Sequence, residues 1–247
     1  MRVIYLSPHL DDAVLSAGGL IREQTDAGIV VEIWTFMAGI PEDKELPEFA
    51  QVMHRIWGLG DGIEAVTARR LEDRRAAAEV GATAVHYDFL DCIYRRGKVG
   101  QALYPDVTVP VHPDDADLPA QIAQTMVAWL RPDDTVVCQL GIGRHVDHII
   151  IRKAAEMLHR PLTYNADIPY LLNHPDDLQP NTLGLHASLH PVSEGGLKCW
   201  IAGIECYASQ VDSVFGSHEL MRQRMEEFWL DQHGVRFWTS QPVSFPG

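Results

Sequence analysis

Near the N-terminus, one histidine and two carboxylates fall within four residues, at His9, Asp11 and Asp12. His9 and Asp12 are suitable metal ligands, and Asp11, if it points elsewhere, would remain free to act as a base. The alternative is structural, because Asp is a favoured N-cap residue and stabilises the positive end of a helix. Taken alone, this cluster supports a metal site and a helix cap about equally.

A second cluster lies far along the chain, where residues 143–148 read GRHVDH. His145 and His148 are three apart at the predicted start of a helix, so their side chains face the same side. Either histidine alone would be read as an ordinary core or surface residue. Two His/Asp clusters at one predicted sheet edge instead indicate three protein ligands with an open position for water, as in catalytic zinc sites. The same ligand types also suit non-heme iron, so Fe2+ is the alternative metal.

Alternating strand and helix patterns predict the frame that holds these clusters. Residues 2–6 form an apolar run of β-forming residues, and a helical pattern at 12–26 precedes a second buried strand at 29–37. This βαβ rhythm continues with helices at about 62–80, 118–131 and 147–159 and strands near 83–90 and 135–141. We expect an α/β fold with a doubly wound, mostly parallel sheet and helices on both faces, with both clusters after strand carboxyl ends.

The last third of the chain is less regular. Residues 161–196 are rich in Pro, Asn, Asp and His and show no sustained period, which predicts loops with short strands and places His186 and His190 in solvent-facing loops. Helices are predicted at 198–214 and 217–232, followed by an edge strand at 235–238. No linker or repeat divides the chain, so residues 1–247 are read as one domain. Trp and Phe residues near the C-terminus are candidates for a homo-oligomer contact.

The composition limits the classes of molecule that the protein is expected to bind. The 247 residues carry 34 Asp and Glu against 20 Lys and Arg, a net charge of −14, which argues against binding nucleic acid. The apolar N-terminal stretch is too short for a signal peptide or a membrane span, so we expect a cytoplasmic protein. The four cysteines show no CxxC spacing and are expected to be buried thiols in a reducing compartment.

Two motifs in this order resemble those of the PIG-L/LmbE-like N-acetylglucosaminyl deacetylase family. SPHLDDAVLSAGG over residues 7–19 is similar to the family's PHPDDE motif, and GRHVDH over residues 143–148 to its HxDH or HxxH motif. Weaker matches are Arg69-x-x-Glu72, Leu90-Asp91 and the YASQ segment at 207–210, for which helix-end packing is the favoured role. The resemblance spans residues 3 to about 210.

The resemblance implies a Rossmann-like fold and a zinc site that removes acetyl from N-acetylglucosaminyl conjugates, as in the mycothiol, bacillithiol and glycolipid-anchor pathways. It also implies roles for single residues of this chain. The metal ligands would be His9, Asp12 and His148, and the general base would be Asp11. His145 would stabilise the tetrahedral intermediate, kept cationic and oriented by Asp147. The residues in contact with the sugar would be Arg69 and Asp91.

The departures from the family pattern concern substrate choice. Leu10 replaces the usual proline and Ala13 the usual glutamate, and neither change removes a ligand. Gly143 stands where some relatives carry a tyrosine that helps to hold the oxyanion, so another residue must supply that role or it is absent.

Three rival functions follow. A metal-dependent amidase acting on a thiol conjugate or an antibiotic intermediate would carry the same motifs. A nucleotide-binding protein would need a glycine-rich loop after the first strand, where this chain has carboxylates. A non-catalytic sugar-binding relative is disfavoured, since all three ligands and a free Asp11 are present.

Overall fold

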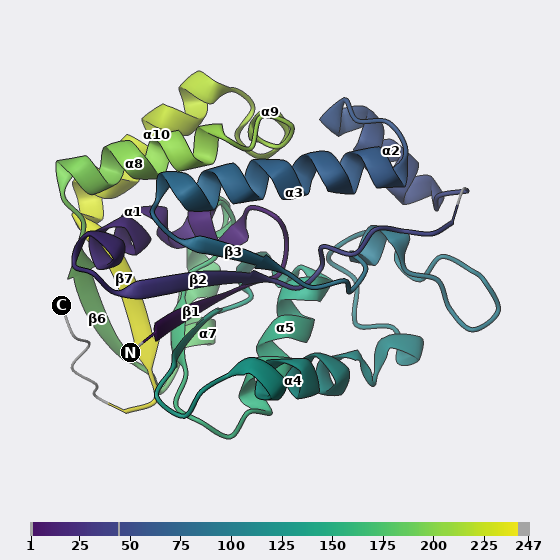
Figure 1. Cartoon of the computed structure of the whole chain (residues 1–247), viewed down its shortest axis with the longest axis horizontal. Helices are drawn as coiled ribbons and strands as arrows, with labels where there is room; N and C mark the ends of the chain where they lie inside the picture. Colours follow the sequence, from purple (N-terminus) through teal and green to yellow (C-terminus); the bar gives the residue numbers. More distant parts are fainter. Residues whose placement is uncertain (1, 44, 242–247) are drawn as a thin grey trace.

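The computed structural model describes residues 2–43 and 45–241, and its centre is a seven-stranded sheet of order β3-β2-β1-β4-β5-β7-β6 (Figure 1). The first five strands in this order are parallel, and β7 is antiparallel to both β5 and β6. The α/β class and the mostly parallel sheet are therefore confirmed. The strands are β1 (Arg2–Ser7), β2 (Val30–Thr35), β3 (Thr83–His86), β4 (Thr135–Gln139), β5 (Thr163–Asn165), β6 (His186–Pro191) and β7 (Gly234–Thr239).

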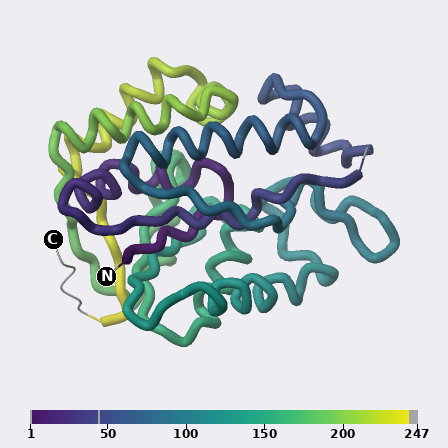
Figure 2. The backbone as a smooth tube through the Cα atoms, viewed as in Figure 1, coloured from purple at the N-terminus to yellow at the C-terminus, as the bar shows by residue number. Residues whose placement is uncertain are grey.

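Helices cover both faces of the sheet and close two separate apolar cores. In Figures 1 and 2, the green and yellow C-terminal helices lie on the same side as the blue α3, and the teal α4 and α5 lie on the other. Among the described residues, no helix is long and apolar enough to cross a membrane. The helices are α1 (Asp12–Asp26), α2 (Glu48–Trp57), α3 (Gly62–Glu79), α4 (Leu118–Trp129), α5 (Val146–Glu156), α6 (Tyr170–Asn173), α7 (Leu178–Thr182), α8 (Glu194–Glu205), α9 (Val211–Phe215) and α10 (His218–Gln232), with 3-10 turns η1 (Cys92–Tyr94), η2 (Pro113–Asp115), η3 (Ile142–Arg144) and η4 (Pro175–Asp177).

Close packing of α8 on α1 secures the helix that begins at the first cluster. A Cβ on Gly18 or Gly19 would lie 2.6 or 2.7 Å from the ring of Trp200, so only glycine allows this approach. The indole N–H of Trp200 donates to the Val14 carbonyl at 2.7 Å. The start of α1, which carries Asp12, is thereby held on a rigid support.

The strand order explains why the two clusters meet. Strand β1 pairs with β2 on one side and with β4 on the other, so the chain changes direction across the sheet between β1 and β4. Such a switch point leaves a crevice at the strand carboxyl ends, which is where ligands bind in open α/β sheets. Strand β1 ends at Ser7 and β4 at Gln139, just before each cluster.

Several sequence-based expectations for the C-terminal third were wrong. The predicted helix at 198–214 is two helices, because the Tyr207 hydroxyl donates to Asp73 at 2.8 Å and Ser209 binds Glu72, which ties the intervening turn to α3. Strand β7 is not an edge strand, since it pairs on both sides. His186 and His190 lie on β6, the actual edge strand, rather than in a loop.

Two further differences concern burial and local pattern. Phe237 and Trp238 are buried within β7, whereas Phe228 and Trp229 of α10 are half-buried, and a subunit contact there stays a prediction. Helix α2 was not predicted, although it proves to line the site described next. Of the cysteines, Cys92 and Cys138 are buried as expected, whereas Cys199 and Cys206 are half-buried; all four are free thiols.

Candidate active site

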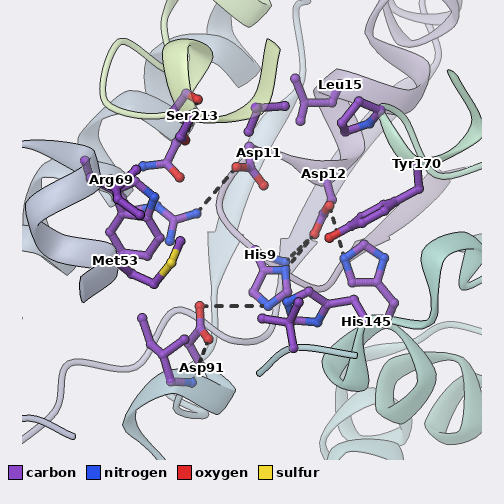
Figure 3. Close-up of a pocket in the computed structure, with 18 of the residues that line it drawn as sticks. His9, Asp11, Asp12, Leu15, Met53, Arg69, Asp91, His145, Tyr170 and Ser213 are labelled. Atoms are coloured by element: carbon purple, nitrogen blue, oxygen red, sulfur yellow. Dashed lines mark hydrogen bonds and ion pairs between the residues drawn. The ribbon is translucent and has the colours of Figure 1, made fainter. Parts of the chain in front are cut away.

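The two clusters converge at the carboxyl ends of β1 and β4 (Figure 3). His9 follows β1, His145 occupies the N-cap position of α5, and His148 lies in its first turn. The ring centroids of His9 and His145 are 4.5 Å apart, and that of His148 is 5.4 and 5.0 Å from them. These three histidines can each offer a nitrogen within 4.8 Å of the others. All three are buried at the floor of a cavity.

Asp12 joins two of the histidines through its carboxylate. Its Oδ2 lies 3.1 Å from Nδ1 of His9, and its Oδ1 lies 3.3 Å from Nε2 of His148. Burial alone would raise the pKa of Asp12, but His148 and His9 hold it well below the usual range. Donor atoms that share a tetrahedral zinc ion at ordinary bond lengths are about 3.3 Å apart. The spacing of Asp12 from each of the two histidines is therefore compatible with a shared divalent metal ion.

The outer nitrogens of both histidines are held by further buried carboxylates. Nε2 of His9 lies 3.1 Å from Asp147, and Nδ1 of His148 lies 2.7 Å from Asp167. Carboxylates that bind the far nitrogen of a histidine fix its orientation and tautomer in metal sites. Both inner nitrogens are thus left facing Asp12.

Asp147 does not have the partner that the sequence suggested. Its carboxylate lies 2.6 Å from Arg95 and 3.1 Å from His9, and it contacts His145 only through its backbone N–H, which donates to Nδ1 at 3.1 Å. An Nδ1 that accepts a hydrogen bond belongs to a neutral imidazole with its proton on Nε2. Burial, with His9 and His148 nearby, lowers the pKa of His145 well below its usual value. His145 is therefore a neutral donor rather than the cation expected.

The Asp11 side chain bonds neither to the three histidines nor to the start of α1 among the described residues. It occupies the N-cap position of α1 but makes no capping hydrogen bond through its side chain, which removes the helix-cap alternative for this residue. Its ion-pair partner is Arg69, at 3.4 Å. Burial and the neighbouring Asp12 raise the pKa of Asp11 to about 6. A carboxylate with this pKa, aimed into the cavity, is suited to proton transfer.

Arg69 and Asp91, the expected sugar contacts, lie on the same cavity as the histidines. Arg69 extends from α3 over the ring of Trp57, 4.6 Å from its centroid, and its buried Nε has no hydrogen-bond partner among the described residues. Asp91 accepts the N–H of Ile93 through Oδ1, while Oδ2 lies 3.8 Å from His9. Both side chains retain hydrogen-bonding capacity toward a ligand.

The ring of Tyr170 explains why position 143 is a glycine. A Cβ on Gly143 would lie 2.2 Å from the Tyr170 ring, and the residue has φ +78°, which also favours glycine. The Tyr170 ring meets His148 edge-on at 5.5 Å and lines the cavity beside Asp12 (Figure 3). An aromatic ring from the segment after β5 thus fills the space beside Gly143.

Asp167 and Tyr170 were missed by the sequence analysis. They follow β5, which has only three residues and no readable periodicity. The available signal was positional, because an Asp and a Tyr come directly after a parallel strand at the same edge of the sheet as both clusters.

Comparison with known proteins agrees with this geometry. The family model described as PIG-L, GlcNAc-PI de-N-acetylase, matches residues 4–159. A curated relative, 2'-N-acetylparomamine deacetylase of Niallia circulans, is 26% identical over 270 residues, which cover 95% of this chain and 92% of the relative.

Two solved structures are also similar over nearly the whole chain. The zinc inhibited form of teicoplanin deacetylase Orf2 has a TM-score of 0.82 and 28% identity, with 97% of each chain covered. The A40926 pseudoaglycone deacetylase Dbv21 has a TM-score of 0.77 and 28% identity, with 96% of each chain covered. With the family motifs placed in one buried site, these matches show that the chain belongs to the PIG-L family of de-N-acetylases and is a hydrolase of the deacetylase type.

Proposed function

We propose that this enzyme removes the acetyl group of an N-acetylglucosaminyl-type conjugate, with zinc held by His9, Asp12 and His148. The observation that best supports this is the Asp12 carboxylate between two histidines whose outer nitrogens are each bound by another carboxylate. A bound zinc ion would supply Lewis acidity, which acidifies water and polarises the amide carbonyl. Fe2+ suits the same donors and is the alternative ion.

Asp11 is proposed as the general base. It would accept one proton from the attacking water and pass it to the amide nitrogen as the C–N bond breaks, so that acetic acid and a free amine leave and the acid then ionises to acetate in solution. Its pKa of about 6 makes it a stronger base than an ordinary carboxylate and a competent acid afterwards. The contact with Arg69 holds the carboxylate without saturating it.

Two neutral donors are proposed to stabilise the oxyanion. The Nε2–H of His145 is fixed by the backbone hydrogen bond to its Nδ1. The hydroxyl of Tyr170 lies beside the Asp12 carboxylate in Figure 3 and forms no hydrogen bond with the part of the chain that the structure describes. Donors in a buried site are effective because they are already oriented when charge develops.

Asp147 is proposed to act through His9, and Arg69 with Asp91 to bind the sugar. Asp147 is fully buried, and Arg95 and the Cys92 N–H hold its carboxylate in place. A guanidinium and a carboxylate together can bind neighbouring sugar hydroxyls as donor and acceptor.

The deciding experiment measures metal content and amine release together. Protein purified without added metal is analysed for zinc and iron, stripped with a chelator and titrated with each ion from substoichiometric amounts. Amine release is then followed from N-acetylglucosaminides and from an N-acetylated thiol conjugate. We expect near one metal per chain and activity on the glucosaminides. Release from the thiol conjugate alone would favour the rival amidase, and full activity without metal would refute the zinc mechanism.

A further inference from the structure

Helix α2 presents an apolar face to the active-site cavity. Met53, Ile56 and Trp57 line this cavity, and their i, i+3, i+4 spacing places them on one side of the helix. Ile56 is 56% exposed, and the other two are half-buried. This face is therefore only partly covered by the protein itself.

The wall formed by α2 is anchored from behind. His54, which is 3% exposed, lies 2.7 Å from the Gly60 carbonyl through Nδ1 and 2.7 Å from the Tyr94 hydroxyl through Nε2. The carbonyl can only accept, so Nδ1 carries the proton and Nε2 accepts from Tyr94. Because these contacts hold α2 in place, its apolar face is a fixed part of the cavity wall.

The apolar wall lies beyond the residues proposed to bind the sugar. Figure 3 shows Met53 and Arg69 on the side of Asp11 away from Tyr170. The Arg69 guanidinium stacks on the Trp57 ring at 4.6 Å, so the apolar face of α2 directly adjoins Arg69. A substrate with its amide at the histidines and its sugar at Arg69 would direct its next group toward α2.

Charge selects among the groups that could occupy this space. Among the described lining residues, the carboxylates are Asp11, Asp12 and Asp91, all close to the histidines, and the permanently charged cation is Arg69, which stacks on Trp57 of α2. Gln210, Ser213 and Val214, which also line the cavity, are uncharged. An ammonium group against this face would lie beside the Arg69 guanidinium, whose Asp11 partner is already shared, whereas a neutral apolar group would cover exposed apolar surface.

We propose that the face formed by Met53, Ile56 and Trp57 is an aglycone subsite that selects N-acetylglucosaminides carrying a neutral, apolar group, such as an aromatic ring, over those carrying a polyamine. This inference rests on the proposed function. It goes beyond that function because it specifies the part of the substrate that the reaction does not change.

The test compares phenyl and methyl β-N-acetylglucosaminide with 2'-N-acetylparomamine on the metal-loaded protein. We expect kcat/KM for the phenyl glycoside to exceed that for the methyl glycoside about tenfold, with the polyamine substrate slowest. Ile56→Ser should lower kcat/KM for the phenyl glycoside several times more than for the methyl glycoside. Ile63→Ser is the matched control, because Ile63 is 61% exposed but does not line the cavity.

Binding measured separately keeps this inference distinct from the reaction. Calorimetry with the Asp11→Asn variant should show tighter binding of the phenyl than of the methyl glycoside even if neither is hydrolysed by the wild type. Equal binding of the two glycosides, preference for the polyamine, or equal effects of Ile56→Ser and Ile63→Ser would overturn the subsite. A dimer that Ile56→Ser dissociates in sedimentation would also overturn it, because the face would then be a subunit contact.

Discussion

Nδ1 of His148 lies 2.7 Å from Oδ1 of Asp167, a carboxylate with no exposed surface. The other oxygen of Asp167 accepts the N–H of Ile142 at 3.0 Å, so the carboxylate is held from both sides. This contact joins the segment after β5 to the start of α5 and keeps Nε2 of His148 directed at Asp12. The geometry of the proposed metal site therefore depends on a residue outside both motifs.

Replacing Asp167 with asparagine should weaken metal binding about 10–100-fold, because the amide is a poorer acceptor for the histidine N–H and no longer supports the ligand. Competition with a zinc chelator measures the effect. Asp176→Asn, at an exposed position on the same segment, is the control. Equal zinc affinity in both variants would show that Asp167 has no part in holding the ion.

Asp11→Asn should lower turnover about 10²–10⁴-fold while leaving the metal content unchanged, because the variant loses the base but none of the three ligands. Steady-state amine release and elemental analysis give the two readings. Asp133→Asn, exposed and at the opposite edge of the sheet, should have wild-type activity. Loss of metal from the Asp11 variant would instead make Asp11 a ligand.

Tyr170→Phe should lower kcat about a hundredfold with little change in KM, since it removes one donor to the developing oxyanion and keeps the ring that packs on Gly143. The control is Tyr87→Phe, whose ring stacks on Phe36 outside the cavity. An unchanged kcat would assign oxyanion stabilisation to His145 without Tyr170.

Gly143→Ala and Gly184→Ala separate backbone strain from steric clash. Both glycines have φ near +80°, at +78° and +79°, but only at Gly143 would the new Cβ meet a neighbour within 4 Å. Gly184→Ala should cost about 1 kcal/mol from the backbone alone. Gly143→Ala should cost about 2–4 kcal/mol and also reduce turnover by displacing Tyr170. Thermal unfolding and amine release test both statements, and equal effects in the two variants would contradict the packing argument.

Asp134→Asn should destabilise the fold by about 3 kcal/mol at neutral pH, because Asp134 pairs with Arg2 at 2.6 Å in a buried position. Burial alone would raise the pKa of Asp134, but Arg2 and the Arg131 N–H lower it. A carboxylate with a lowered folded-state pKa stabilises the fold above its unfolded pKa, and this contribution is lost as pH falls through the folded value. The difference from wild type in denaturant unfolding should therefore shrink below about pH 4. A difference that is constant with pH would contradict the ion-pair explanation.

Most of the parallel core was predictable because its signals are local. The run at Arg2–Ser7 is buried on both faces and reads as a continuous apolar strand, and α1 has the predicted bounds. The short strand β5 and the break after Glu205 were not readable in the same way. The three residues of β5 are too few to show an alternating hydrophobic pattern. The break after α8 depends on hydrogen bonds from Tyr207 and Ser209 to α3, a helix more than a hundred residues earlier in the chain.

The sequence by itself determined that His9, Asp11, Asp12, His145 and His148 follow the ends of parallel strands, because residue types and spacing are encoded locally and parallel strands share one carboxyl edge. Only the tertiary structure decided which partner each side chain meets. The backbone at the start of α5 turns Nδ1 of His145 toward a peptide N–H and sends the Asp147 carboxylate to His9 and Arg95. Asp167 and Tyr170 contact His148 because the fold brings the segment after β5 next to α5, and no sequence motif connects them. Such long-range contacts and side-chain directions are set by packing.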